Sequence, residues 1–298
     1  MSAGPKFYVD AFIFALTGGL IAISYKWCYS AGWDVSPLSL GGYRALVVGI
    51  CYLTVALTRG ERLLPRGRAL WYLGIASQFK MAYNALFVWA LVRVDAAFMT
   101  IMVACLLPIF GLCLTRMANP IHDRLWIGRV SGCILGGIAA ALMGFRDSNE
   151  PGSISTQAFL IVSLICLGLA ISMVTERKAI EHGATRLQSM LGATLYSAPG
   201  YFIAALLLGE NFIGPLGTPA GLWTLFLCIL IGVTHFGARR DAMEASQVSG
   251  FLLIELLPRA ITVCAALLLL NEVLDWTAIV GLIVMPVAIW IGRYKPAI

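Results

Sequence analysis

The stretch Gln247–Pro258 reads Gln-Val-Ser-Gly-Phe-Leu-Leu-Ile-Glu-Leu-Leu-Pro, and its pattern occurs a second time in the chain. The second copy is Ala97–Pro108, which reads Ala-Phe-Met-Thr-Ile-Met-Val-Ala-Cys-Leu-Leu-Pro. Both stretches end in Leu-Leu-Pro, and their prolines lie 150 residues apart (258 minus 108). A repeat of half the chain length inside apolar segments indicates an internally duplicated membrane protein. Many secondary transporters are built in this way.

The composition predicts that lipid is the solvent. Hydrophobic residues make up 60% of the 298 residues, charged residues only 12%, and the mean hydropathy is +0.87. A water-soluble domain of this size cannot bury so much apolar surface. The apolar runs are continuous rather than alternating, which favours helices over a β-barrel. The first run is long enough to span, so it is not interpreted as a cleavable signal peptide.

Ten apolar segments are long enough to cross a membrane as helices. They cover about residues 8–29, 37–58, 69–91, 96–116, 125–144, 157–176, 188–208, 221–238, 248–270 and 275–293. We therefore predict an all-α membrane protein of ten transmembrane helices. Residues 1–150 form a first five-helix repeat and residues 151–298 a second one. Because five is odd, the second repeat runs through the membrane in the opposite direction.

The distribution of basic residues predicts the orientation. With the N-terminus inside, 15 of the 21 Lys and Arg residues fall on the inner side, Arg239 among them, and only Arg93 and Arg146 on the outer side. This bias places both termini in the cytoplasm of a multi-pass protein of the bacterial inner (plasma) membrane. The net charge of +6 then faces anionic membrane lipid and does not indicate a nucleic-acid partner.

The sequence resembles the drug/metabolite transporter superfamily, and within it the EamA-type transporters. The likeness covers essentially the whole chain and rests on the five-plus-five layout and on short motifs. These are Ala96-Ala97 with Leu106-Leu107-Pro108, Ala245-Ser246 with Leu256-Leu257-Pro258, Leu270-Asn271-Glu272-Val273-Leu274, and the helix around Gly281. One departure is Arg116-Met117-Ala118-Asn119, where the second repeat has its Leu-Asn-Glu motif. The resemblance implies an exporter of amino-acid-like metabolites.

Four charged residues lie well inside predicted spans, where each needs a partner or an aqueous cavity. Lys80 and Arg259 fall near the midplane, and Arg44 lies nearer the outer end of its segment. Glu255 precedes Arg259 by four residues, so the two side chains share one helix face. One interpretation places all four around a central substrate site. The other makes Glu255 and Arg259 an internal ion pair and sends Lys80 to the inner interface.

Aromatic side chains and helix breakers extend the candidate site. Tyr83 and Trp89 either line the substrate pocket with Lys80 or pack against lipid. The candidate hinges are Gly18, Gly19, Pro108 and Pro258. The two prolines either bend their helices at a cavity or form purely structural kinks.

Histidines raise two further possibilities. His235 is either a proton relay or a packing residue. An alternative function, a membrane-embedded enzyme or a lipid-handling scaffold, would rest on His122-Asp123, the closest candidate for a catalytic pair. No Walker A or His-Glu-x-x-His motif occurs, and the eight cysteines form no Cys-x-x-Cys pair. We therefore predict no enzyme, no metal and no cofactor, and transport driven by a gradient or by exchange.

The predicted function is secondary transport of a small polar metabolite by alternating access. The cations Lys80, Arg44 and Arg259 outnumber Glu255 within the spans, which predicts a substrate with a carboxylate or phosphate. A cationic or apolar drug-like substrate is the alternative. The expected partners are the substrate, membrane lipid and a coupling ion or exchanged solute. Small residues at 128, 132, 136, 140 and 144 form a ridge for helix packing, within a monomer or across a homodimer.

Overall fold

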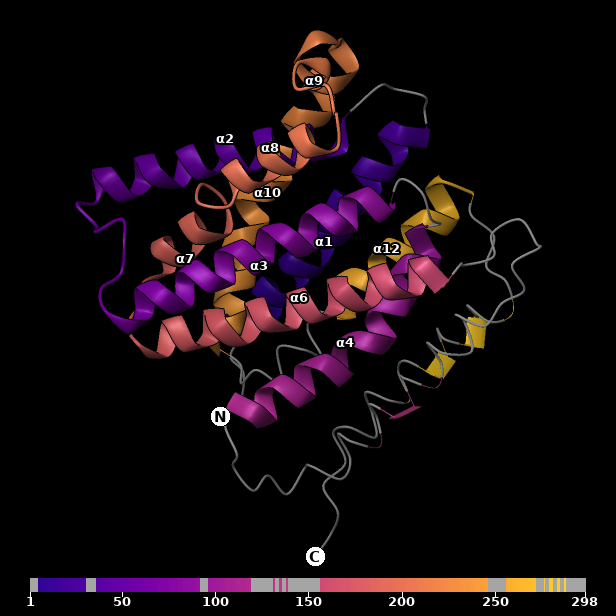
Figure 1. Cartoon of the computed structure of the whole chain (residues 1–298), viewed down its shortest axis with the longest axis horizontal. Helices are drawn as coiled ribbons and strands as arrows, with labels where there is room; N and C mark the ends of the chain where they lie inside the picture. The colour runs from indigo at the N-terminus through magenta and orange to yellow at the C-terminus, as the bar shows by residue number, and fades with distance from the viewer. Residues whose placement is uncertain are drawn as a thin grey trace, which may run out of the picture.

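The computed structural model of the chain is a bundle of helices (Figure 1). It describes residues 5–30, 36–91, 96–118, 131, 134–135, 138, 156–245, 256–271, 276, 279–280, 283–284 and 287. The helices are α1 (Pro5–Ser30), α2 (Pro37–Thr58), α3 (Arg68–Leu91), α4 (Ala96–Ala118), α6 (Thr156–Glu181), α7 (Arg186–Ala193), α8 (Ala198–Leu207), α9 (Gly214–Gly217), α10 (Pro219–Ala245) and α12 (Leu256–Leu269). No β-strand occurs among the described residues.

The prediction of an all-helical protein with membrane-spanning helices is confirmed. Within the described residues, five helical stretches are long and apolar enough to cross a membrane. They are Val9–Trp27, Pro37–Thr58, Phe159–Glu181, Arg186–Leu207 and Gly221–Arg239. Two shorter apolar helices, Ala96–Gly111 and Pro258–Leu269, accompany them. Most of the predicted segments 125–144 and 275–293 lie outside the described residues.

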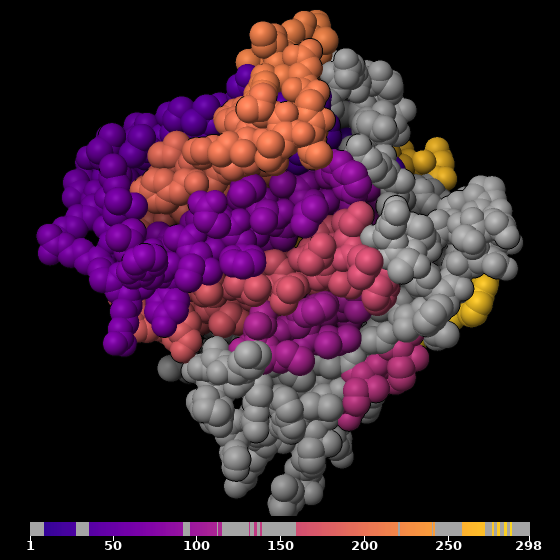
Figure 2. Space-filling view, in the orientation of Figure 1, coloured from indigo at the N-terminus to yellow at the C-terminus, as the bar shows by residue number. Residues whose placement is uncertain are grey.

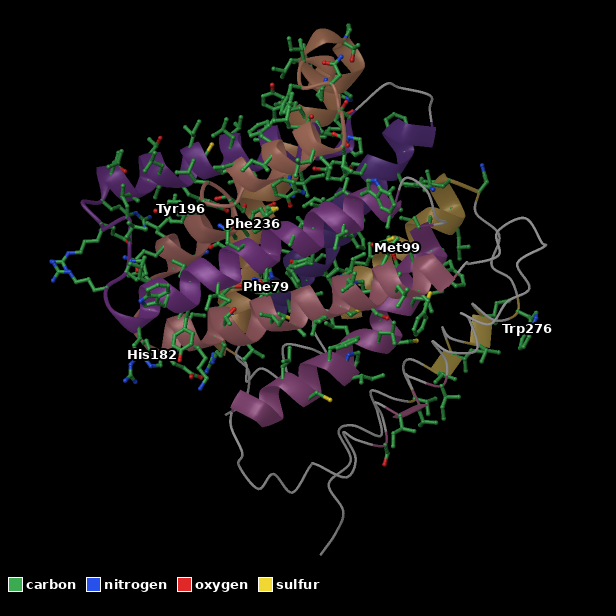
Figure 3. All side chains as sticks on the ribbon, viewed as in Figure 1. Phe79, Met99, His182, Tyr196, Phe236 and Trp276 are labelled. Atoms are coloured by element: carbon green, nitrogen blue, oxygen red, sulfur yellow. The ribbon has the colours of Figure 1, made fainter. Side chains whose placement is uncertain are left out.

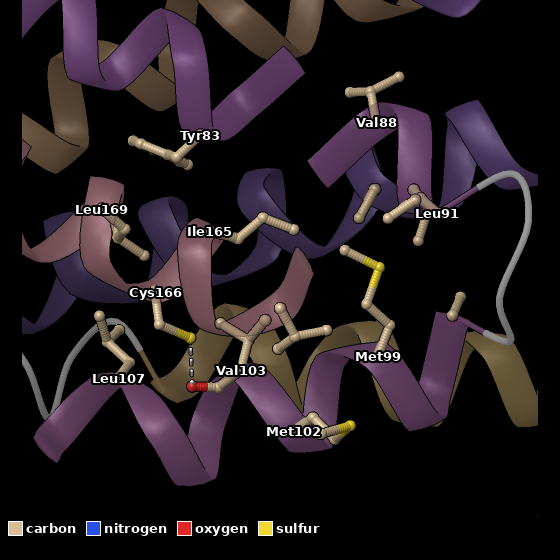
Figure 4. Close-up of a cluster of buried hydrophobic side chains, with 14 of the residues drawn as sticks. Tyr83, Val88, Leu91, Met99, Met102, Val103, Leu107, Ile165, Cys166 and Leu169 are labelled. Carbon is tan, nitrogen blue, oxygen red and sulfur yellow. Dashed lines mark hydrogen bonds between the residues drawn. The ribbon is translucent and has the colours of Figure 1, made fainter. Parts of the chain in front are cut away.

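The main hydrophobic core forms where α4 packs against α6. Every residue from Ala96 to Leu107 is buried, as expected for a helix that is apolar on all sides. Figure 4 shows Val103 and Met99 of α4 facing Ile165 and Cys166 of α6. Helix α3 packs along the other side of α6, so α6 is enclosed by two helices of the first half.

The start of α2 is capped by a residue far away in the sequence. Glu210, in the turn after α8, accepts hydrogen bonds from the backbone N–H groups of Leu38 and Ser39, with N–O distances of 3.0 Å each. Such N–H groups have no partner inside their own helix, and a carboxylate there also interacts favourably with the helix dipole. Glu210 therefore ties the start of α2 to the end of α8, and the two helices pack side by side (Figure 1).

The predicted single helix over 188–208 is wrong in one respect, because the chain breaks it into α7 and α8. Helix α7 ends at Ala193, and Thr194 leaves helical geometry at φ −125° and ψ −86°. Pro199 explains the break, since it has no N–H to donate to the carbonyl of Leu195 and its ring excludes a regular turn there. The two helices still form one apolar stretch, Arg186–Leu207.

The break lies directly against Gly49 of α2, and this contact gives a first prediction. A Cβ added at Gly49 would lie 2.7 Å from the backbone nitrogen of Leu195. Gly49→Ala should therefore lower the free energy of unfolding by about 1–3 kcal/mol, because backbone must move to admit the methyl group. Thermal unfolding in detergent measures the change.

Gly74→Ala is the matched control, since nothing lies within 4 Å of a Cβ at Gly74 in α3. This variant should leave stability unchanged or raise it by up to about 1 kcal/mol, the difference in helix propensity between Gly and Ala. Equal unfolding midpoints for the two variants would contradict the close packing of α2 on the broken helix.

Candidate functional site

A cavity of about 90 Å³ lies between helices from both halves of the chain. The residues that line it are Phe14, Gly18, Ile21, Ala22 and Tyr25 of α1, Arg44 of α2, Lys80, Tyr83, Asn84, Phe87 and Val88 of α3, His235, Phe236 and Arg239 of α10, and Pro258 and Arg259 of α12. Five aromatic rings and four basic side chains are among them, and no carboxylate is among these described lining residues.

Helix α3 supplies its share of the lining through one face. Positions 80, 83, 84 and 87 follow the three-and-four spacing that places side chains above one another on a helix. Trp89 lies roughly 160–180° around the helix from Lys80 and Phe87, and it packs against the main hydrophobic core. The structure therefore places Lys80 and Tyr83 at the cavity and Trp89 outside it.

Glu176 of α6 holds two of the cations. Its Oε2 lies 3.2 Å from Nζ of Lys80 and 2.6 Å from Nη1 of Arg239, and all three side chains are 4% exposed. The carboxylate thus joins three helices, α3, α6 and α10, at one buried point. The side chain of Lys80 is buried in this pairing, which favours the interpretation that places it at the central site.

Neither Glu176 nor Arg239 was predicted as a site residue. The predicted segments ended at 176 and 238, whereas α6 continues to Glu181 and α10 to Ala245. Arg239 was counted among the basic residues of the inner side, and the structure shows that its side chain is buried and paired with Glu176. The sequence signal that could have identified them is their position, because Glu176 and Arg239 each lie at the end of an apolar run.

Arg44 and Arg259 meet aromatic faces at the cavity. The guanidinium carbon of Arg44 lies 5.6 Å from the ring centre of Tyr25, and that of Arg259 lies 5.3 Å from the ring centre of Phe87. Both geometries fit cation–π interactions. Nε of each arginine is buried and has no hydrogen-bond partner among the described residues. These two donors are available to an acceptor that enters the cavity.

His235 is anchored at the cavity wall. Its Nδ1 lies 3.1 Å from Oγ1 of Thr17, and that hydroxyl is already 2.6 Å from the carbonyl oxygen of Ile13. A threonine hydroxyl has one proton to donate, and Thr17 donates it to the carbonyl oxygen of Ile13. The hydroxyl oxygen of Thr17 therefore accepts a hydrogen bond from Nδ1–H of His235. Nε2 is then the acceptor nitrogen. Phe14 also contacts the imidazole, with ring centres 5.0 Å apart.

Three of the four candidate hinge residues, Gly18, Gly19 and Pro258, lie where α1 crosses α12. A Cβ at Gly18 would come within 3.0 Å of Cβ of Pro258, and one at Gly19 within 2.6 Å of Cγ2 of Ile261. These glycines therefore permit a close helix crossing beside the cavity. Pro108 lies inside α4, which continues beyond it to Ala118, and does not line the cavity. Pro258 lies in the first described turn of α12.

Several predicted residues lie outside the described residues. They are Glu255, the His122-Asp123 pair, and all five positions of the small-residue ridge, 128, 132, 136, 140 and 144. Among the described residues, no group of three or more His, Cys, Asp or Glu side chains could hold a metal ion.

The comparisons with known proteins bear on the fold. No protein-family model and no curated protein matches the chain. In contrast, 23 chains of solved structures are similar to it. One, described as the crystal structure of a protein, has a TM-score of 0.67 and 14% sequence identity, over 98% of this chain and 97% of that chain. At this identity the likeness is one of fold, and the fold alone does not assign a substrate.

Proposed function

We propose that this protein is a secondary transporter that moves a small polar metabolite with an anionic group across the membrane. One observation carries the proposal, the surplus of cations at the cavity between the halves. Arg44, Lys80, Arg239 and Arg259 line it, and Glu176 is the one buried carboxylate among the described residues. Buried cations are costly unless an anion or water meets them, and a substrate carboxylate or phosphate would supply that anion.

The proposed architecture is ten transmembrane helices in two inverted repeats, residues 1–150 and 151–298, as in EamA-type drug/metabolite transporters. The cavity lining supports it, because α1, α2 and α3 of the first half meet α10 and α12 of the second there. Substrate sites between inverted repeats, with discontinuous helices nearby, are a recurring design of secondary transporters. The chain also contains a discontinuous helix, at the α7–α8 break against α2.

The substrate would be held at its anionic end by Arg259 and Arg44, whose Nε groups lack partners among the described residues. Lys80 would add charge while remaining paired with Glu176. The rest of the substrate would contact the rings of Tyr83, Phe87 and Phe236. At about 90 Å³ the cavity is smaller than the roughly 300 Å³ of ordinary ligand pockets, so binding requires the helices to separate, as alternating access does.

Transport by purified protein in liposomes tests the proposal. Amino acids, carboxylates and phosphorylated metabolites are each tested separately in these liposomes. Cationic and neutral drug-like compounds are tested in the same way, as representatives of the alternative substrate class. We expect uptake or exchange of at least one anionic compound in liposomes with a proton or sodium gradient, or with the same solute on both sides. Movement of cationic or neutral compounds alone would overturn the anionic substrate, and movement of none would overturn transport.

The contact between Arg259 and Phe87 gives a prediction about substrate affinity. Phe87→Ala removes the ring that lies 5.3 Å from the guanidinium and leaves the arginine free to rotate. Binding of the transported compound should weaken about threefold to thirtyfold, which corresponds to the usual strength of a cation–π contact. Phe79→Ala is the control, because Phe79 is an exposed ring on the same helix (Figure 3). Equal affinities for the two variants would contradict the positioning role of Phe87.

A further inference from the structure

A second hollow, of about 750 Å³, opens at the end of the bundle where α2 meets α3 and α6 meets α7. Figure 2 shows the α2–α3 connection, in violet, projecting at the left of the molecule. Its lining includes Arg59, Arg62 and Arg66 of that connection and Arg186 at the start of α7. These residues belong to neither the central cavity nor its transport role, so the hollow needs its own explanation.

The hollow carries a strong excess of positive charge. Four arginines line it, and Glu61 is the one carboxylate among its described lining residues. Arg186 pairs with Asp241 at 2.9 Å and is thereby fixed in position. No ion pair involves Arg59, Arg62 or Arg66 among the described residues. Three guanidinium groups are therefore free to meet an external anion.

The loop that presents these arginines is anchored by two hydrogen bonds to its backbone. Nε2 of Gln188 donates to the carbonyl oxygen of Arg62 at 2.9 Å, and the Tyr196 hydroxyl donates to the carbonyl oxygen of Leu63 at 3.1 Å. Gln188 is itself fixed, because it forms a capping box with Thr185 at the start of α7. A site whose frame is already ordered loses less conformational entropy on binding.

Apolar side chains beside the hollow indicate its depth in the membrane. Trp71, one turn into α3, is 76% exposed, and Leu57 and Leu64 are 62% and 51% exposed. Exposed tryptophan and leucine next to a row of arginines are typical of the level where lipid tails meet headgroups. Figure 3 places His182 and Tyr196 at this same end of the bundle.

We propose that this hollow binds the phosphate headgroup of an anionic phospholipid. Guanidinium groups bind phosphate oxygens through paired hydrogen bonds, and basic pockets between helices at the membrane surface are suited to anionic headgroups. The exposed apolar residues would contact the acyl chains of the same lipid. This site is separate from the proposed substrate cavity, so its test does not depend on the transported compound.

Native mass spectrometry of the purified chain in neutral detergent tests the proposal. Phosphatidylglycerol is titrated against phosphatidylcholine, and the affinity of each lipid is measured. The test variant is Arg62→Gln with Arg66→Gln. The control is Arg68→Gln with Lys178→Gln, which removes the same charge at the same end of the bundle from residues that do not line the hollow.

We expect the unmodified chain to prefer phosphatidylglycerol, the test variant to bind it about thirtyfold more weakly, and the control to bind it as before. Equal losses in both variants would overturn a specific site in favour of general surface charge, as would no loss in either. Displacement of phosphatidylglycerol by millimolar inorganic phosphate would overturn the lipid as the ligand and indicate a soluble phosphate compound instead.

Discussion

Replacing Glu176 with glutamine is expected to lower the free energy of unfolding by about 3–5 kcal/mol. The carboxylate lies 3.2 Å from Lys80 and 2.6 Å from Arg239, and all three side chains are almost fully buried. Without its negative charge, two cations remain next to each other in a medium that solvates them poorly. Chemical or thermal unfolding in detergent measures the loss.

Glu181→Gln is the matched control because it lies on the same helix. Glu181 is 42% exposed and pairs with Arg177 at 3.2 Å, so its loss should cost no more than about 0.5 kcal/mol. Adding Lys80→Met to Glu176→Gln should recover part of the lost stability, because one of the two uncompensated cations is removed. A Glu176→Gln protein as stable as the Glu181→Gln protein would contradict the buried ion-pair network.

Arg259→Ala should weaken binding of the proposed anionic substrate by a factor on the order of 100 or more, because a charged hydrogen-bond donor is lost at the cavity. Arg259→Lys should also weaken binding, although the charge is kept, since lysine lacks the planar pair of donors that matches a carboxylate or phosphate. Isothermal titration with the compound identified in liposomes gives both affinities, and Arg68→Ala at the exposed start of α3 is the control.

A different set of affinities would favour the alternative substrate class. If Arg259→Ala and Lys80→Ala leave binding intact while Glu255→Gln abolishes it, the substrate is cationic and Glu255 recognises it. In that case the rings of Tyr25 and Phe87 would contact the substrate's positive group instead of the arginines.

Helix boundaries were predictable where the sequence changes character sharply. Helix α2 covers Pro37–Thr58, the same residues as the predicted segment, because a proline begins the apolar run and an arginine follows it. The break between α7 and α8 was not predicted, since the run stays apolar across it. A hydropathy pattern records where a chain can be buried and does not show the backbone hydrogen bond that Pro199 removes.

The sequence also identified some residues of the candidate site and missed others. Depth along a helix identified Lys80, Arg44 and Arg259, and all three line the cavity. Glu176 and Arg239 were missed for the same physical reason that makes them important. A charged residue beside an apolar run normally marks the membrane surface. Here each is buried because the other neutralises it, and that partner lies 63 residues away in the sequence.

The cap on α2 sets the order in which the molecule can be completed during synthesis. Glu210 lies 172 residues after Leu38, so the ribosome needs roughly 10–30 s to supply the cap after α2 begins to emerge. Helices α1 and α3 wait as well, because they pack most extensively against α10, α12 and α6. The first half of the nascent chain therefore enters the membrane before the helices that it packs against in the folded protein have been synthesised. Until then, lipid or the insertion machinery must cover the helix faces that are buried in the folded protein.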